Sequence, residues 1–240
     1  MSDKAVFSVI IPVGPGDSVS VTLLDQVATL LAGRGEIIIA NAAGNILAQN
    51  ILEKQQRHNI RVINSEAGRA TQLNKAADSA AGTFLWFVHA DSNLAEVASD
   101  GLQVVIDHAS ERRLWYFDLK FSDAEVLPMQ INEFGVWWRC RFLAMPFGDQ
   151  GFLIEKKFFD GLGQYPLGQP YGEDHLFVWQ ARRNSFRISP IGQVLSTSAR
   201  GYAQTGWLRQ TLRYLWWTYK QAIPAALRLH PAINKVRLEP

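Results

Sequence analysis

The residues best suited to chemistry follow an apolar run near the middle of the chain. Residues 84–88 are predicted to form a buried strand, and His89, Ala90 and Asp91 stand at its carboxyl end. Ligands of open parallel sheets bind outside such strand ends, where one or two carboxylates and a diphosphate typically hold a hard divalent cation. In an extended backbone, His89 and Asp91 would point to the same side. The alternative is that Asp91 only caps a following helix.

An alternation of strands and helices surrounds this segment and would place it at a sheet edge. Continuous apolar runs predict buried parallel strands at residues 6–13, 36–40, 60–64 and 84–88. Periodic apolar positions predict helices at 45–56, 70–81 and 93–108, and one containing Val21 to Leu31 that Asp17 or Ser18 caps. This repeat predicts a mostly parallel sheet with right-handed crossovers.

The second half of the chain is less regular. Strands are predicted at 114–121, 151–154 and 188–196, and helices at 131–142, 156–162, 174–183 and 207–222. No linker marks a domain boundary. Seven of the eight tryptophans lie between Trp115 and Trp217, which indicates aromatic-lined binding surfaces or a membrane-facing element in this half.

Composition narrows the class of protein. The chain has 240 residues, 48% of them apolar, enough for the core of one large α/β domain. A net charge of +2 argues against a dedicated nucleic-acid binder. The single cysteine, Cys140, suits a reducing compartment. The first residues lack the features of a signal peptide, and no apolar stretch reaches the ~20 residues that span a bilayer. We therefore expect a cytoplasmic protein, either free or at the inner face of the membrane.

Four segments in order resemble a known family. They are SVIIPV, GRATQLNKAADSAAGTFLWFVHADS, GDQGFLI and YGEDHLFVWQARR, with STSARGY as a weaker fifth. Together they resemble the family 2 glycosyltransferases of GT-A fold, and most closely a bacterial branch with His-Ala-Asp in place of Asp-x-Asp. The resemblance runs from Ser8 to about Arg213. It implies a GT-A catalytic domain over residues 1–200, with a mixed, mostly parallel sheet flanked by helices, and a C-terminal helical extension over 201–240 packed on it.

The resemblance implies roles for individual residues. Asp91 would bind Mn²⁺ or Mg²⁺ bridging the donor diphosphate, and His89 would face the nucleotide. Asp174 would be the general base of an inverting transfer, taking the proton from the acceptor hydroxyl. Arg69 would approach the donor phosphates, as its place at a helix N-terminus also favours. The alternatives are a surface helix-cap contact for Arg69 and a purely electrostatic role at a helix N-terminus for Asp174.

Further positions match less distinctive parts of the family pattern. Arg69, Asn74 and His89 would face the donor, together with Pro12, Asp17 and Asn41. Asp149, Gln150 and Glu173 would line the acceptor side, although a polar turn explains Asp149 and Gln150 nearly as well. The chain departs from the family at Asn41, where an aspartate usually contacts the base, and in the first loop, VGPGD, where Asp17 would substitute for an Asn-Glu pair.

The predicted function is metal-dependent, inverting transfer of a sugar from a nucleoside-diphosphate sugar to an acceptor hydroxyl. The alternatives are a degenerate, non-catalytic module that binds a sugar nucleotide or a protein, and a nucleotidyltransferase. The acceptor is not identified: Trp137, Trp138 and Trp179 could stack on a sugar or lipid, but such residues more often belong to the core. The helix at 207–222 suits peripheral membrane contact, or packing on the catalytic domain or a homodimer partner.

Overall fold

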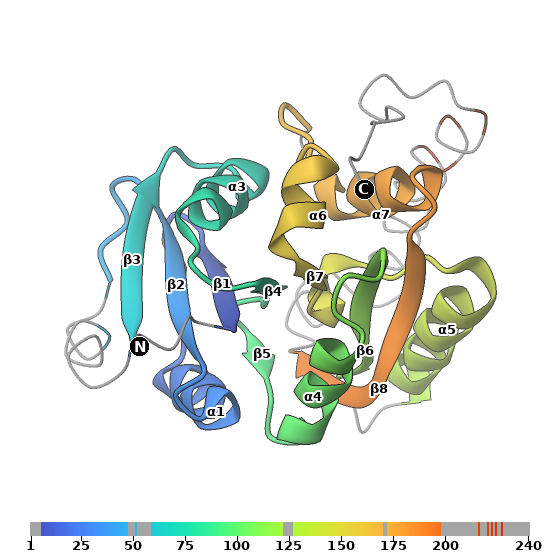
Figure 1. Ribbon diagram of the computed structural model, residues 1–240, viewed down its shortest axis with the longest axis horizontal. Helices are drawn as coiled ribbons and strands as arrows, with labels where there is room; N and C mark the ends of the chain where they lie inside the picture. Colours follow the sequence, from blue (N-terminus) through green and yellow to red (C-terminus); the bar gives the residue numbers. More distant parts are fainter. Residues whose placement is uncertain are drawn as a thin grey trace.

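The computed structural model describes residues 6–47, 51, 59–121, 127–169 and 172–197, and single residues at 216, 220, 222, 224 and 227. An eight-stranded sheet runs through this part in the order β3-β2-β1-β4-β7-β6-β8-β5 (Figure 1). The strands are β1 (Phe7–Val13), β2 (Gly35–Ala42), β3 (Ile60–Ser65), β4 (Phe84–Phe87), β5 (Ser92–Asn93), β6 (Arg113–Phe121), β7 (Leu153–Glu155) and β8 (Arg187–Thr197).

The pairing of the strands confirms the predicted mixed, mostly parallel sheet. The strands β3, β2, β1 and β4 run parallel to one another. Next to them, β7 runs antiparallel to both β4 and β6, β8 runs parallel to β6, and β5 is antiparallel to β8. The carboxyl ends of β1 to β4 therefore lie at one edge of the sheet.

Helices cover both faces of the sheet (Figure 1). Apolar residues of α1 and α4 pack on one face, and those of α3, α6 and α7 on the other. The alternation along β1 serves both layers, because Val9 and Ile11 face one side and Ile10 the other. The helices are α1 (Val21–Leu31), α3 (Arg69–Ser79), α4 (Ser99–Asp107), α5 (Leu127–Leu143), α6 (Lys156–Gly161) and α7 (Glu173–Arg183).

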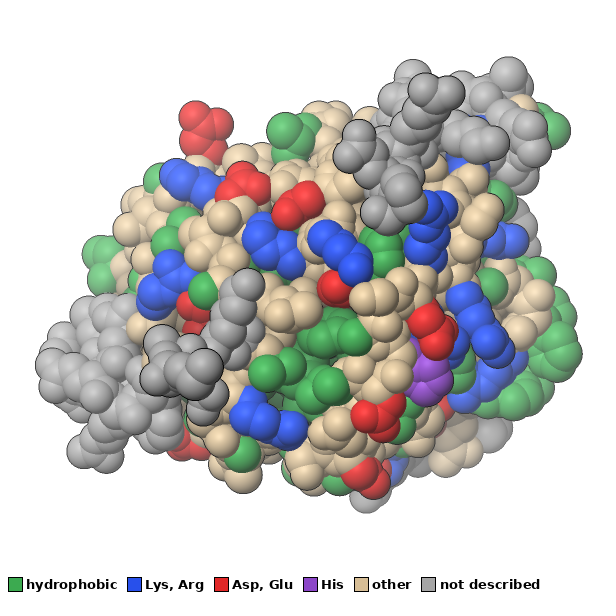
Figure 2. Space-filling model, viewed as in Figure 1, with side chains coloured by type: hydrophobic (Ala, Val, Ile, Leu, Met, Phe, Trp, Pro, Cys, Tyr) green, Lys and Arg blue, Asp and Glu red, His purple; other side chains and the backbone are tan. Residues whose placement is uncertain are grey.

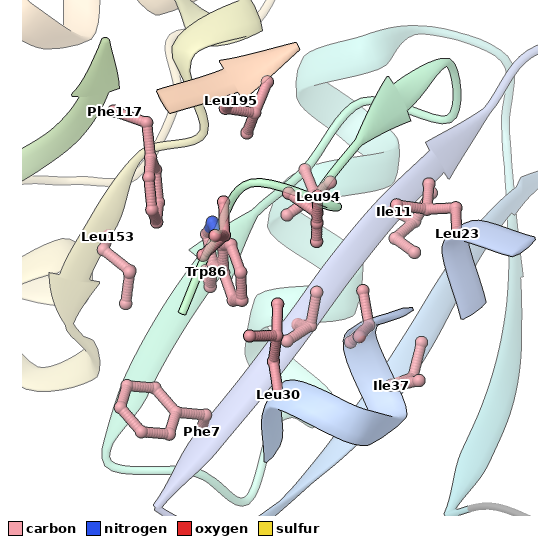
Figure 3. Close-up of a cluster of buried hydrophobic side chains, with 14 of the residues drawn as sticks. Phe7, Ile11, Leu23, Leu30, Ile37, Trp86, Leu94, Phe117, Leu153 and Leu195 are labelled. Carbon is pink, nitrogen blue, oxygen red and sulfur yellow. The ribbon is translucent and has the colours of Figure 1, made fainter. Parts of the chain in front are cut away.

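One buried cluster joins the parallel strands to the second half of the sheet. Trp86 of β4 stacks on Phe117 of β6 with ring centroids 5.4 Å apart, and Leu153 of β7 lies beside them (Figure 3). Trp86, Phe117 and Leu153 are fully buried. An offset aromatic pair in a core contributes about 0.5–1.5 kcal/mol beyond the burial of its area.

Two predicted helix starts are wrong. The helix α1 begins at Val21 with Ser20 as its cap, whose side chain accepts from the Thr22 N–H at 3.2 Å, so neither Asp17 nor Ser18 caps it. The helix predicted at 93–108 begins only at Ser99. Its first residue, Asn93, instead belongs to β5, which pairs with the end of β8 more than a hundred residues away. Such a long-range pairing leaves no pattern in the neighbouring sequence.

Other predictions fall wholly or partly outside the described residues. Residues 45–47 are not helical, and most of the rest of the helix predicted at 45–56 is not described. The helix predicted at 207–222, and with it the extension at 201–240, is described only at single residues, so the division into a domain and an extension stays a prediction. Within the described part of the chain, no helix is long and apolar enough to cross a membrane.

Candidate active site

Three chain segments meet around the side chain of Arg69. Arg69 is the first residue of α3, and its Nε lies 3.3 Å from Oε1 of Glu173, the first residue of α7. Its Nη2 also contacts Nε2 of His89, just beyond the end of β4. The N-termini of two helices and the carboxyl end of a central strand therefore converge here. Arg69 therefore does more than make a helix-cap contact at the surface, which was the alternative to a role in donor binding.

The contact between Arg69 and His89 defines the protonation of the imidazole. A guanidinium can only donate hydrogen bonds, so Nε2 of His89 must accept, which leaves the proton on Nδ1 of a neutral ring. Burial and the positive charge of Arg69 lower the pKa of His89 to about 3. His89 is therefore a neutral polar group at neutral pH.

Asp91 lies on the same side as His89, as predicted, although the backbone between them is not extended. It forms a turn in which the Ser92 N–H donates to the His89 carbonyl at 3.1 Å. Nδ1 of His89 is 3.9 Å from Oδ1 of Asp91, whose side chain is 37% exposed. Because α4 starts at Ser99 with Ala98 as its cap, Asp91 does not cap that helix. Its carboxylate is thus available at the sheet edge.

Asp174 is held ionised by its surroundings. Its Oδ2 accepts from the Gly148 N–H at 2.6 Å, and its Oδ1 accepts from the His175 N–H at 2.8 Å. Burial alone would raise the pKa of Asp174, but the charge of Arg69 and these N–H donors outweigh it and hold the pKa below its usual value. In Glu173, by contrast, burial and the negative charge of Asp174 raise the pKa against the opposing charge of Arg69.

A single 3₁₀ turn, η1 (Gly148–Gln150), brings Asp149 to the same site. Oδ1 of Asp149 is buried and has no hydrogen-bond partner. Burial raises the pKa of Asp149 to about 6, and the negative charges of Asp174 and Asp91 add to that increase, while Arg139 opposes it. A buried oxygen without a partner is costly, so this carboxylate is suited to a ligand hydroxyl or cation.

Gln150 and Asn74 make contacts with the protein itself. Gln150 is 1% exposed. Its Oε1 accepts from the Phe147 N–H at 3.0 Å and its Nε2 donates to the Phe117 carbonyl at 3.0 Å. The amide of Asn74 bonds the backbone of Tyr165 in both directions, at 2.8 and 3.0 Å. These side chains position the site loops, and nothing in these contacts supports the direct roles predicted for them.

The residues predicted to face the nucleotide base lie in a second group, at the ends of β1, β2 and β3. Asn41 is 3% exposed, and its Nδ2 donates to Asn64 Oδ1 at 2.9 Å and to the Asn45 carbonyl at 3.0 Å. Both of its N–H groups are therefore used within the protein. Asp17 is exposed in the loop after β1, where its carbonyl accepts from Asn45 Nδ2 at 3.3 Å. Pro12, which is half-buried, lies opposite Ala40.

Sequence reasoning missed Gln72 and Gly148. Gln72, buried on α3, donates through Nε2 to the carbonyls of Val13 at 2.8 Å and Ala40 at 2.6 Å. It thereby ties the helix that carries Arg69 to the ends of β1 and β2. The signal for Gln72 was its spacing three residues after Arg69, which places both toward one side of a helix. For Gly148, the only signal in the sequence was its position directly before Asp149.

The cluster fits a cation shared with a diphosphate better than a metal centre built from protein alone. Among the described residues, no group of three or more His, Cys, Asp or Glu side chains could hold a metal ion. The cluster offers the partly exposed carboxylate of Asp91 and the unpartnered Oδ1 of Asp149. Mg²⁺ and related hard cations commonly take one or two carboxylates and complete their shell with phosphate oxygens and water.

Comparison with solved structures defines the fold. TarS from S. aureus (residues 1–349) is similar with a TM-score of 0.58 at 17% identity, over 81% of this chain and 58% of that one. Glucosyl-3-phosphoglycerate synthase from Mycobacterium tuberculosis, in complex with Mn²⁺, UDP and phosphoglyceric acid, is similar with a TM-score of 0.59 at 12% identity, over 96% of this chain and 80% of that one. The mannosyltransferase PcManGT from Pyrobaculum calidifontis, in complex with GDP-Man and Mn²⁺, has a TM-score of 0.51 at 14% identity, over 80% and 57%.

These neighbours give the chain the GT-A fold of nucleotide-sugar glycosyltransferases, as predicted. The chain spans less than two thirds of the length of TarS 1–349, namely 58%. No protein-family model and no curated protein matches the sequence. Membership of family 2, and of its His-Ala-Asp branch, therefore stays a prediction.

Proposed function

We propose that the protein transfers a sugar from a nucleoside-diphosphate sugar to an acceptor hydroxyl, with inversion and with the help of Mn²⁺ or Mg²⁺. The observation that carries the proposal is the convergence of Arg69, the His89–Asp91 turn and Asp174 at the edge formed by the carboxyl ends of the strands. The GT-A neighbours crystallised with UDP or GDP-Man and Mn²⁺ support it.

In this proposal Asp174 is the general base. Its lowered pKa keeps it ionised at neutral pH, so it can accept the proton of an acceptor hydroxyl as that oxygen attacks the anomeric carbon. Inversion in a single displacement needs one base and no covalent nucleophile. The Gly148 and His175 N–H donors fix both carboxylate oxygens, which orients the base before the acceptor arrives.

Arg69 would connect donor binding to the strength of that base. Arg69 begins α3, where the helix N-terminus and the guanidinium both favour a diphosphate. The same charge lowers the pKa of Asp174. A diphosphate that takes up hydrogen bonds of Arg69 would weaken this effect, so Asp174 would become a stronger base only once the donor is in place.

Asp91 would hold the divalent cation, whose chemistry is to neutralise charge on the departing diphosphate. The neutral imidazole of His89 beside Asp91 adds no competing positive charge to the cation site. Asp149 would face the acceptor with its unpartnered Oδ1. Arg69 and the α3 N-terminus would bind the diphosphate before and after the bond breaks.

Thermal unfolding with UDP, GDP, CDP and dTDP, each with and without Mn²⁺, tests the donor and cation site. A ligand at about 100 times its dissociation constant stabilises by about 2.7 kcal/mol, and each kcal/mol raises Tm by roughly 2–4 °C at this size. We expect a rise of several degrees for one nucleotide that depends on Mn²⁺ and is lost in Asp91→Ala. Asp107→Ala removes an exposed carboxylate at the end of α4 and serves as the matched control.

A shift that persists in Asp91→Ala, or no shift with any nucleotide in a folded protein, would refute the site. The base is tested separately, with the donor so identified. Asp174→Asn should still bind the nucleotide but lose transfer, and near-normal transfer would rule Asp174 out. Release of pyrophosphate from a nucleoside triphosphate would instead favour the nucleotidyltransferase.

A further inference from the structure

The helix α5 has an outward face that is almost entirely apolar. Its large exposed side chains are Ile131 (53% exposed), Phe134 (64%), Trp137 (43%), Trp138 (45%), Phe142 (65%) and Leu143 (48%). Of the two alternatives for Trp137 and Trp138, the core does not apply, because both side chains are exposed. We call these six residues the α5 face. In Figure 2, hydrophobic side chains gather at the right-hand edge, where α5 lies in Figure 1.

The side chains of the α5 face form an exposed surface and take no part in the hydrophobic core. Ile131, Phe134, Trp138 and Phe142 follow the spacing of one helical stripe, while Met129 and Cys140, on the inner side of the helix, are buried in the core. Rings along the face contact one another, with centroids 5.5 Å apart for Trp138 and Phe142. Contiguous exposed apolar patches of this kind mark interaction sites.

The charges around the α5 face favour an anionic partner. Arg139 and Arg141 lie on the same helix, where Arg141 pairs with Asp118 at 2.9 Å, and Arg182 donates to the Leu143 carbonyl at its end at 3.0 Å. The only acid of α5, Glu133, accepts from the Phe121 N–H at 2.7 Å and so is turned to the protein. In Figure 2, Lys and Arg side chains stand beside the hydrophobic edge. Tryptophan and phenylalanine flanked by arginine are typical of helices that lie in the headgroup layer of a membrane.

The inner side of α5 contacts the acceptor side of the candidate site. Arg139 stacks on the ring of Phe147, with its guanidinium carbon 3.5 Å from the ring centroid. Cys140 Sγ donates to Gln150 Oε1 at 3.2 Å. Between Phe147 and Gln150 lies the turn that holds Gly148 and Asp149. A surface bound to the α5 face would therefore be separated from the carboxylates that face the acceptor by the helix itself, a distance of about 10 Å.

We propose that the α5 face docks on an anionic lipid bilayer and holds the acceptor side of the site about 10 Å, one helix diameter, from it. The docking follows from the exposed aromatic side chains and the flanking arginines. The further consequence, that the acceptor is a hydroxyl carried by an amphiphile in that bilayer, rests on the proposed function. The helix contacts the site through Arg139 and Cys140, so docking and chemistry share one rigid element.

Cosedimentation of the full chain with vesicles tests the docking. Vesicles of phosphatidylcholine alone are compared with vesicles that also contain phosphatidylglycerol, and the test variant is Trp138→Gln/Phe142→Gln. We expect the wild type to bind the anionic vesicles more tightly, with binding that weakens as salt is added. Losing two exposed aromatic anchors should lower the partition coefficient roughly thirty-fold or more. Leu167→Gln, at a residue that is 60% exposed outside α5, is the matched control.

Each alternative occupant gives a distinct contrary result. A wild type that stays in solution with both kinds of vesicle refutes the proposal. This is also the result expected if residues 198–240 cover the α5 face. Equal sedimentation of the double variant and the wild type refutes it too. If light scattering finds the wild type dimeric and the double variant monomeric, the α5 face is instead an interface between two copies of the chain. Vesicle binding should persist in Asp174→Asn, so failure of the docking and failure of the catalytic proposal can be told apart.

Discussion

Replacing Gly148 with alanine tests whether Arg69 and Asp174 act as one unit. A Cβ at this position would lie 2.8 Å from Nη2 of Arg69, and 2.9 Å from Oδ2 and 3.1 Å from Cβ of Asp174. Gly148 is not among the glycines with positive φ. Alanine therefore brings no backbone strain, and the perturbation is a wedge between the two charged groups.

The size of the effect follows from these distances. The guanidinium and the carboxylate must each retreat by about half an ångström to reach ordinary contact. A misplacement of about 1 Å in a catalytic group can cost on the order of a hundredfold in rate. We expect donor turnover to fall about ten- to a hundredfold. The loss of stability should stay below about 1.5 kcal/mol, because the end of the Arg69 side chain can move.

The assay is release of the nucleoside diphosphate from the identified donor, together with thermal unfolding of each variant. Gly135→Ala is the control, because a Cβ at Gly135, within α5, meets nothing within 4 Å. That variant should keep its turnover and gain roughly 0.5–1 kcal/mol from helix propensity. If Gly148→Ala folds normally and keeps turnover within about twofold of wild type, the coupling of Arg69 to Asp174 is wrong.

Two further predictions concern pH and positioning. The unfolded chain releases the Asp149 proton at a lower pH than the folded protein, in which the pKa is about 6, so this group lowers the free energy of unfolding as pH rises from about 4 to 6. Asp149→Asn should remove this dependence on pH and raise the free energy of unfolding by roughly 1–2 kcal/mol above pH 6 after screening. Urea unfolding at several pH values between 4 and 6 measures this, and a pH dependence equal to that of the wild type would contradict the prediction. Asn74→Ala should cost about 1–3 kcal/mol by freeing backbone groups of Tyr165 while leaving the nucleotide-induced rise in Tm intact. A lost rise with an unchanged Tm would instead support the predicted donor role of Asn74.

Much of the fold could be read from local pattern. The strands β1, β2 and β4 are continuous apolar runs because parallel strands are buried on both faces, and each was predicted within about two residues. The short strand β5 was missed because its pairing with β8 is not local. For Trp137 and Trp138 the sequence left a binding surface and the core open, because composition records how apolar a helix is and not which of its faces finds a partner.

The candidate site was also predicted only in part from the sequence. The rule that ligands bind at the carboxyl ends of strands singled out His89 and Asp91, and family resemblance added Arg69 and Asp174. That Arg69 contacts His89 and Glu173 depends on how the start of α3 meets the segment after β4 and the start of α7. The commitment of Asn74 to Tyr165 likewise joins positions 91 residues apart.

The sequence by itself determined the alternation of strands and helices, the edge of the sheet where polar residues collect, and the types of residue available there. The hydrophobic period and the residue types at strand ends are local properties, so they can be predicted from the sequence. Only the tertiary structure decided which polar side chains face one another. It lowers the pKa of Asp174, leaves an Asp149 oxygen without a partner and uses both N–H groups of Asn41 within the protein. Burial and the distance between charges set these properties, and both arise only when distant segments pack together.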